Sequence, residues 1–155
     1  MFVYQTNRKM KNKITFKDAL VDTINFYGSN LDARTDGCYF DGENRCAVGR
    51  FIAEGNEDFF REFDRIENNG VEAVIHGYQD KVRRDSNRII TSDEAARDLT
   101  VIGDVTMDDL LYLQIIHDGG ENWTKGGLSD FGWEAIQGFW PNLFEEIKEM
   151  QLQHA

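Results

Sequence analysis

The spacing of apolar side chains predicts a chain built mostly of helices. Between Phe16 and Tyr27 they recur every three to four residues, which is the period of one helical face. Thr15 stands at the position of an N-cap residue, and Gly28-Ser29-Asn30 is a run that ends helices. We therefore expect the first helix to cover residues 16–27.

Similar patterns predict the remaining helices. Asn56, Thr106, Ser129 and Asn142 stand as N-caps before four of the apolar patterns. The helix after Thr106 is apolar over much of its circumference, which is typical of a central helix. We expect these helices at residues 57–67, 92–99, 107–117, 130–139 and 143–152. A short helix could also begin at Gly49 and run to residue 53, and the apolar residues at the start of 71–87 could line one face of another.

A β-hairpin is predicted between the first two helices. Cys38-Tyr39-Phe40 and Arg45-Cys46-Ala47-Val48 are short apolar runs, and the Asp41-Gly42-Glu43-Asn44 turn separates them. With no repeat or interdomain linker, the pattern predicts a mostly helical α+β fold, a single compact domain with one small β-hairpin.

Composition fits one such domain. The 155 residues are 41% apolar and 12% aromatic, enough for a substantial core at this length. No apolar run approaches the roughly 18 residues of a membrane span, and no hydrophobic segment follows the first charges as in a secretory signal. We expect a flexible basic tail at residues 1–13, a single helix-rich domain at 14–155, and a cytoplasmic location.

The net charge of −11 restricts the partners. Residues 101–155 hold ten acids and two bases, which disfavours direct binding to nucleic acids or membranes. A protein partner remains, and so does a second possibility, that the acidic surface imitates DNA. The acids would then have to be spaced like phosphates, which a sequence does not reveal.

Two cysteines, Cys38 and Cys46, are too few for a disulfide scaffold and indicate a reduced compartment. Across the hairpin they could form a redox disulfide or half of a zinc site, depending on the register. Burial as two small apolar side chains is the other interpretation. Since the three histidines are scattered, we expect no metal site.

A catalytic alternative pairs Cys46 with His117. If a helix begins at Gly49, its dipole would lower the pKa of the Cys46 thiol. His117, next to Asp118, could then act as the base of a hydrolase or transferase.

The segment from His117 to Trp123 allows two interpretations. His117-Asp118-Gly119-Gly120 could simply end a helix, or it could form a polar pocket with Trp123 as its wall and Lys125-Gly126-Gly127 as a flexible lip. Phosphate-binding, dinucleotide and common hydrolase motifs are missing, so the sequence implies no cofactor. Candidate binding residues are Asp41, Gly42, Arg45, Arg50, His117, Asp118 and Trp123.

Two strings in order resemble a family of small bacteriophage and prophage proteins. They are Cys-Ala-Val-Gly at residues 46–49, after a Cys-Tyr strand and a glycine turn, and Leu-Gln-x-x-His-Asp at residues 113–118, followed by Trp123. Where that family often has a further cysteine, this chain has Arg50. Residues 71–98 look like an insertion, and the C-terminal extension is long.

The resemblance implies a phage origin and a compact fold that places Cys46 near His117, but no established activity. Small acidic phage proteins without catalytic motifs often bind and inhibit host proteins. We therefore expect a non-enzymatic accessory protein in the bacterial cytoplasm that inhibits a host protein of defence, transcription or replication. The alternatives are a Cys46/His117 enzyme and a sponge for a small nucleotide signal; the oligomeric state is left open.

Overall fold

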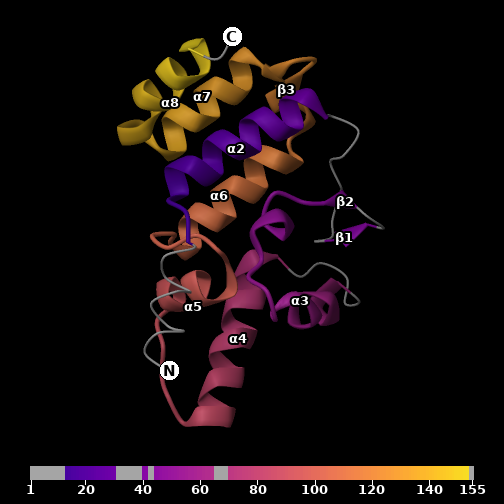
Figure 1. The fold of residues 1–155 in the computed structure, drawn as a ribbon, viewed down its shortest axis with the longest axis vertical. Coiled ribbons are helices and arrows are strands. Elements are labelled where there is room, and N and C mark those ends of the chain that lie inside the picture. Colours follow the sequence, from indigo (N-terminus) through magenta and orange to yellow (C-terminus); the bar gives the residue numbers. More distant parts are fainter. Residues whose placement is uncertain (1–12, 31–39, 42–43, 65–69, 154–155) are drawn as a thin grey trace. The chain divides into compact units, whose positions relative to one another are not determined.

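A computed structural model describes residues 13–30, 40–41, 44–64 and 70–153 (Figure 1). Its contacts group the chain into two compact units. The first unit takes residues 1–16 and 51–111, and the second takes 17–50 and 112–155. Neither unit is a contiguous stretch, since the boundary crosses the chain three times, once just inside the first helix and once inside α6.

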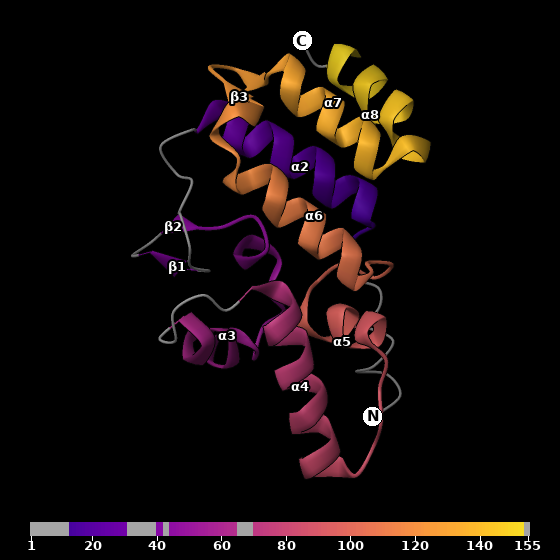
Figure 2. The same ribbon diagram turned by 180° about the vertical axis from the view of Figure 1, so that it is seen from behind.

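The second unit is built around helices. Helices α2, α7 and α8 lie side by side (Figures 1 and 2). The bounds of its elements are α2 Phe16–Ser29, β1 Phe40–Asp41, β2 Asn44–Arg45, η2 Gly49–Phe51, α6 Met107–Asp118, η3 Gly120–Asn122, β3 Trp123–Thr124, β4 Gly127–Leu128, α7 Asp130–Phe139 and α8 Pro141–Gln153.

The first unit packs α3 (Glu57–Asp64), α4 (Val71–Ser86) and α5 (Ser92–Leu99) around a short extended segment. The segment after α5 pairs on both sides, since Val101 donates its amide to Phe51 at 2.8 Å and accepts one from Ile14 at 2.9 Å. These backbone bonds satisfy polar groups that the core would otherwise leave unpaired.

The predicted fold class, a mostly helical α+β domain, is confirmed. Helices α5 and α7 begin and end where the apolar pattern places them, and α2 and α6 run only slightly further. Predicted caps hold as well: Ser129 Oγ accepts the amide of Gly132 at 3.1 Å. Thr106 and Asp109 exchange two bonds of 3.1 Å in a capping box.

Three local details differ from the prediction. Helix α8 begins at Pro141, not after Asn142, because proline lacks the amide that the first helical position would leave unpaired. The helix expected from Gly49 is only the three-residue 3₁₀ turn η2. A second hairpin, β3 with β4, encloses Lys125 and Gly126, where Gly126 has a φ of +102°.

The first hairpin, formed by β1 and β2, is confirmed, with Phe40 opposite Arg45 and Asp41 opposite Asn44. This register differs by one residue from the pairing that would set position 38 against position 46. Cys38 itself lies outside the described residues, as do Gly42 and the expected tail at 1–12. Lys13, at the tail's predicted end, donates a hydrogen bond to the Arg97 carbonyl.

Each unit has its own apolar core. The largest fully buried side chains of the first unit are Phe60, Ile75, Leu99, Ile102 and Leu110. Those of the second unit are Leu20, Tyr27, Leu113, Ile116, His117, Ile136 and Ile147. Among the described residues, no helix combines the length and the apolar character needed to cross a bilayer.

Candidate functional site

The predicted centre of the second unit is a closed aromatic cluster. Tyr27 and His117 are both fully buried, and their rings meet edge to face with centroids 4.8 Å apart. Trp123 lies against the same tyrosine at 6.0 Å and donates its indole N–H to the Ile116 carbonyl at 3.0 Å. Helix α2 supplies the tyrosine, α6 the histidine and β3 the tryptophan, so the cluster joins α2 to a segment that lies far from it along the chain.

A short polar chain continues from His117. Its Nδ1 lies 2.8 Å from Asp118 Oδ1, and the same carboxylate oxygen accepts a bond from Gln114 Nε2 at 3.0 Å. The Gln114 amide oxygen in turn accepts the Val48 N–H at 3.5 Å. Gln114 therefore joins the Cys-Ala-Val-Gly segment to the Leu-Gln-x-x-His-Asp segment.

Cys46 is also fully buried, and its Sγ accepts the Gly49 N–H at 3.3 Å. Because η2 has only three residues, there is no helix dipole of useful size to activate the thiol. Cys46 does lie near the tyrosine: burial raises the pKa of Tyr27, Arg50 lowers it and Cys46 raises it further. Cys46 and His117 thus both neighbour Tyr27, in a place that solvent does not reach.

Arg50 is engaged within the same unit. Its guanidinium forms an ion pair of 2.7 Å with Asp22 and lies over the Phe26 ring, 3.8 Å from the centroid. Such a stacked arginine retains its charge while its plane is covered. Arg50 therefore fastens η2 to α2, where the sequence suggested a binding residue.

The Gly-Gly turn after His117 is tightly packed. Asn122 Nδ2 donates to the Ile116 carbonyl at 3.1 Å, and a Cβ added at Gly132 would lie 2.3 Å from the Asn122 carbonyl oxygen. This glycine lets α7 approach η3 closely. The turn thus closes the second unit, the structural alternative raised for this segment.

Other predicted binding residues cannot be placed as fully. Asp41 and Arg45 are described only through the strand pairing of β1 and β2, and Gly42 lies outside the described residues. Within the described ranges, no group of three or more His, Cys, Asp or Glu side chains could hold a metal ion.

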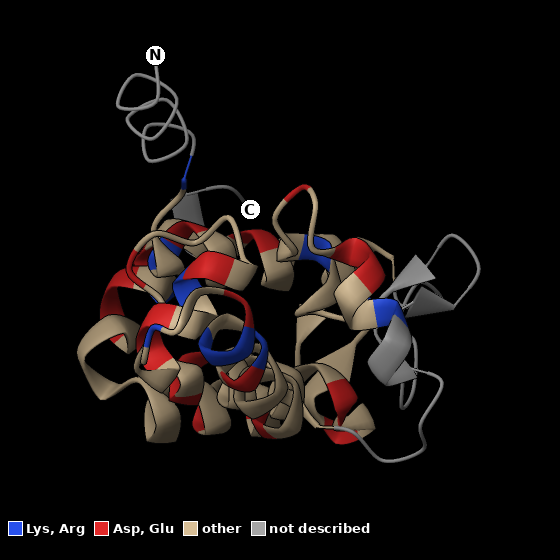
Figure 3. Cartoon of the chain, turned by 90° about the horizontal axis from the view of Figure 1, so that it is seen from below, with Lys and Arg blue, Asp and Glu red and all other residues tan. Residues whose placement is uncertain are grey.

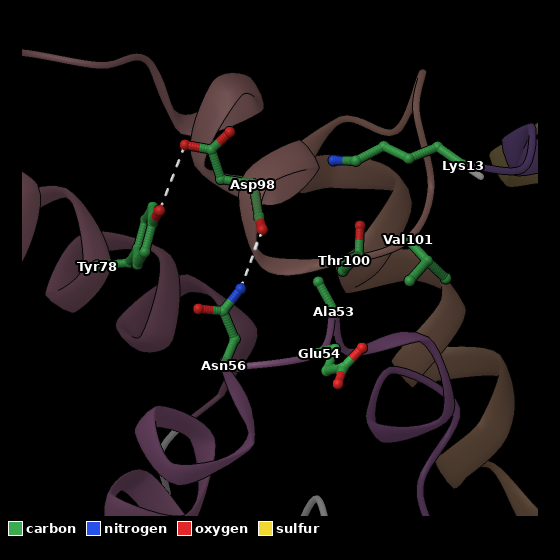
Figure 4. A pocket seen from close by; sticks show the side chains of 9 residues that line it. Lys13, Ala53, Glu54, Asn56, Tyr78, Asp98, Thr100 and Val101 are labelled. Carbon is green, nitrogen blue, oxygen red and sulfur yellow. Dashed lines mark hydrogen bonds between the residues drawn. The ribbon is translucent and has the colours of Figure 1, made fainter. Parts of the chain in front are cut away.

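A hollow of about 610 Å³ in the first unit carries none of the predicted site residues (Figure 4). Tyr78 on α4 donates its hydroxyl to Asp98 at 3.3 Å, and Asn56 donates its amide to the Asp98 backbone carbonyl at 3.1 Å. Burial, followed by the charge of Asp98 and this hydrogen bond, raises the pKa of Tyr78. The lining residues are Lys13, Ala53, Glu54, Gly55, Asn56, Tyr78, Asp98, Thr100 and Val101.

Sequence reasoning missed three residues that contribute to these sites. Gln114 is a polar residue within the apolar pattern of α6. A glutamine in such a pattern needs a hydrogen-bond partner, and this signal in the sequence could have identified it. Tyr78 and Asp98 come from two helices and meet only through the fold, so no spacing rule connects them.

Known proteins offer no guide to the site. Neither family models, nor curated proteins, nor solved structures match this chain. Function must therefore be argued from its own surface and core.

Proposed function

We propose that this chain is a bacteriophage accessory protein that binds and inhibits a host protein of defence, transcription or replication without catalysing a reaction. The observation that carries the binding role is a half-buried apolar strip on α6 and α7 in which Ile115 and Phe131 are exposed. We define this α6–α7 strip by the side chains Tyr112, Ile115, Phe131, Ala135 and Phe139. The phage origin and the host target rest on the sequence resemblance.

Helix spacing and one ring contact define the strip. Phe131, Ala135 and Phe139 follow one another at four-residue steps on one flank of α7. Tyr112 of α6 stacks on Phe139 with the centroids 4.3 Å apart and the planes 9° from parallel. Ile115 lies one turn further along α6, so the two helix flanks join at the stacked rings.

Two members of this strip are exposed, and the other three are half-buried. Phe131 is 56% exposed and Ile115 52% exposed, although both are large apolar side chains. Exposed apolar side chains gathered on one surface are typical of protein-binding sites, while scattered single ones are ordinary. The strip therefore has the character of the centre of an interface.

The charges around the strip favour a basic partner. Asp130 and Glu134 are exposed close to Phe131 on α7, and Asp118 follows Ile115 by three residues on α6. From Tyr112 to Ala155 the chain carries seven acids and two bases, and acids predominate along the described chain as a whole (Figure 3). A protein surface with an apolar centre and a Lys- or Arg-rich rim would complement this arrangement.

The buried state of Cys46 and His117 weighs against catalysis. A nucleophile and base must reach the substrate, and neither side chain has any exposed surface. Both side chains are instead part of the buried core of the second unit, where the His117 ring packs against Tyr27.

The test introduces glutamate at exposed apolar residues, either in the α6–α7 strip or at a control position outside it. Tagged protein is recovered from a bacterial lysate and weighed by native mass spectrometry, as wild type, as Ile115→Glu with Phe131→Glu, and as Ile89→Glu. Ile89 is 92% exposed and belongs to the first unit, which makes it the matched control.

We expect a host protein on the wild type and on Ile89→Glu, and none on the double variant. A bare protomer in every sample would overturn the binding role. Equal recovery by the double variant would place the interface elsewhere.

A further inference from the structure

The second unit contains a smaller hollow whose chemistry differs from its surroundings. It measures about 270 Å³ and lies among the end of α2, the β3–β4 hairpin, α7 and α8. Ligand sites for drug-sized molecules start at roughly 300 Å³, so this hollow suits a smaller molecule. Its polar lining comes from Asn25, Ser29, Lys148 and Gln151, and Trp133 supplies a flat wall.

No carboxylate lines this hollow, although the chain has 28 acids and 17 basic residues. Lys148 is the charged residue of this lining, and its ammonium lies 5.3 Å from the centroid of the Phe144 ring. Among the described residues no acid pairs with it, while Lys17 and Arg50 of the same unit are paired with Glu146 and Asp22. The hollow therefore presents an available cation.

Gln151 adds an unsatisfied donor. Its Nε2 atom is buried and has no hydrogen-bond partner among the described residues. Leaving such a group unpaired costs about 1–3 kcal/mol, so proteins rarely do so without a reason. A ligand oxygen placed in the hollow would satisfy this amide.

The rim of the hollow is preformed. The amide of Gly126 donates to the Gly28 carbonyl at 3.0 Å, which fixes the β3–β4 hairpin against the end of α2. A Cβ added at Gly28 would lie 2.8 Å from the Gly127 Cα, so the two backbones are already in contact. On the far wall, Trp133 packs edge to face against Phe144 at 6.3 Å.

We infer that this hollow binds a small organic anion, a flat ring carrying one carboxylate or phosphate group. The anionic group contacts the Lys148 ammonium and the Gln151 amide, and the ring lies on Trp133. No acid in the lining repels the anionic group. The site is separate from the α6–α7 strip, because Trp133 and Phe131 lie on different flanks of α7.

The experiment uses ligand pairs that differ in charge. The protein is labelled with 5-fluorotryptophan, and Trp133→Phe assigns the resonance of Trp133 among the three tryptophans. Nicotinate is titrated against nicotinamide, and cytidine monophosphate against cytidine. The two pairs distinguish a carboxylate ligand from a phosphate ligand.

We expect the anion of at least one pair to shift the Trp133 resonance and its neutral counterpart not to do so. Lys148→Gln and Gln151→Leu should each weaken that binding by about tenfold. Lys125→Gln, a charge removed from outside the lining, should leave it unchanged.

Thermal unfolding separates lost binding from lost folding. Gln151→Leu should unfold at the same or a higher temperature than the wild type, because it removes a buried unpaired donor. No shift with any of the four compounds up to about 10 mM, where even weak sites are occupied, would overturn the inference. Equal shifts with charged and neutral partners would also overturn it.

Discussion

The aromatic centre around Tyr27 and the large hollow beside Tyr78 contrast in what fills them. The first gathers the residues with the most suggestive chemistry, Cys46 and His117, and packs them without exposed surface. The second is lined by residues that belong to no motif, yet it leaves about 610 Å³ open. In these two regions the thiol and the imidazole lie in the core, while the open space is lined by Tyr78, Asp98 and other polar side chains.

Truncating each tyrosine would test this contrast most strongly. Tyr27→Ala should cost about 3–5 kcal/mol of unfolding free energy, because it empties a fully buried ring site. Tyr78→Ala should cost about 1 kcal/mol, since its ring already borders open space. Urea unfolding followed by circular dichroism measures both. Equal losses would mean that the hollow is packed as tightly as the centre.

The rate at which the Cys46 thiol is alkylated tests whether the aromatic centre around Tyr27 is closed to solvent. In a Cys38→Ser background, native protein should react with iodoacetamide at least about a hundredfold more slowly than urea-unfolded protein, because labelling requires opening of the core. Mass spectrometry against time and pH gives the rates. A thiol that reacts rapidly below neutral pH would restore the catalytic alternative.

Two helical glycines should respond in opposite directions. Gly28→Ala should destabilise the protein by about 1–3 kcal/mol, since the new Cβ would collide with the Gly127 backbone at 2.8 Å. Gly138→Ala on α7 meets open space and should stabilise it by about 0.5–1 kcal/mol. Thermal unfolding of the two variants checks the signs. If Gly28→Ala left the thermal stability unchanged, the β3–β4 hairpin would have to move readily to make room for the new Cβ.

Alkaline pH should lower the stability of the protein through the ionisation of Tyr27. Burial raises the pKa of Tyr27 above its ordinary value of 10.0, so the folded state keeps a proton that the unfolded state releases. The free energy of unfolding therefore keeps the full contribution of Tyr27 below pH 10. Above pH 10 this contribution falls by at most about 1.4 kcal/mol per pH unit. Tyr27→Phe should flatten this decline, which chemical unfolding between pH 9 and 11 would measure. An unchanged slope would assign it to other groups.

The smallest effect concerns Asp98. Asp98→Asn removes the charge that, after burial, contributes most to raising the pKa of Tyr78, so that pKa should fall toward its ordinary value. Absorbance titration at 295 nm, with Tyr78→Phe to identify the signal, detects the change. A pKa that does not move would attribute the shift to burial alone.

Local sequence rules succeeded where local physics decides. The Ser129 cap and the Thr106–Asp109 capping box fixed the starts of α7 and α6, since these bonds form within four residues. The last helix was predicted at residues 143–152 with Asn142 as its N-cap, although Pro141 is the first residue of α8. The β3–β4 hairpin was not predicted, since Lys125-Gly126-Gly127 was interpreted as a flexible lip and not as the turn and first strand residue of a hairpin.

The prediction of the site was likewise limited to what a sequence pattern can indicate. The resemblance implied that Cys46 lies near His117; in the structure the His117 ring packs against Tyr27, and Cys46 is one of the groups that raise the pKa of Tyr27. It gave no sign that the centre is closed, because burial depends on which helices cover it. The polar link through Gln114 was also hidden, since its partners are Val48 and Asp118.

What the sequence determined alone was the helical fold class, most helix boundaries, the first hairpin and the acidic charge. Each follows from the period of apolar residues, from caps within a few positions, or from composition. Only the tertiary structure decided which residues are exposed, which hollows stay open and which distant side chains meet. Those properties arise from contacts between segments such as α2, η2 and α6, whose separation along the chain no local pattern encodes.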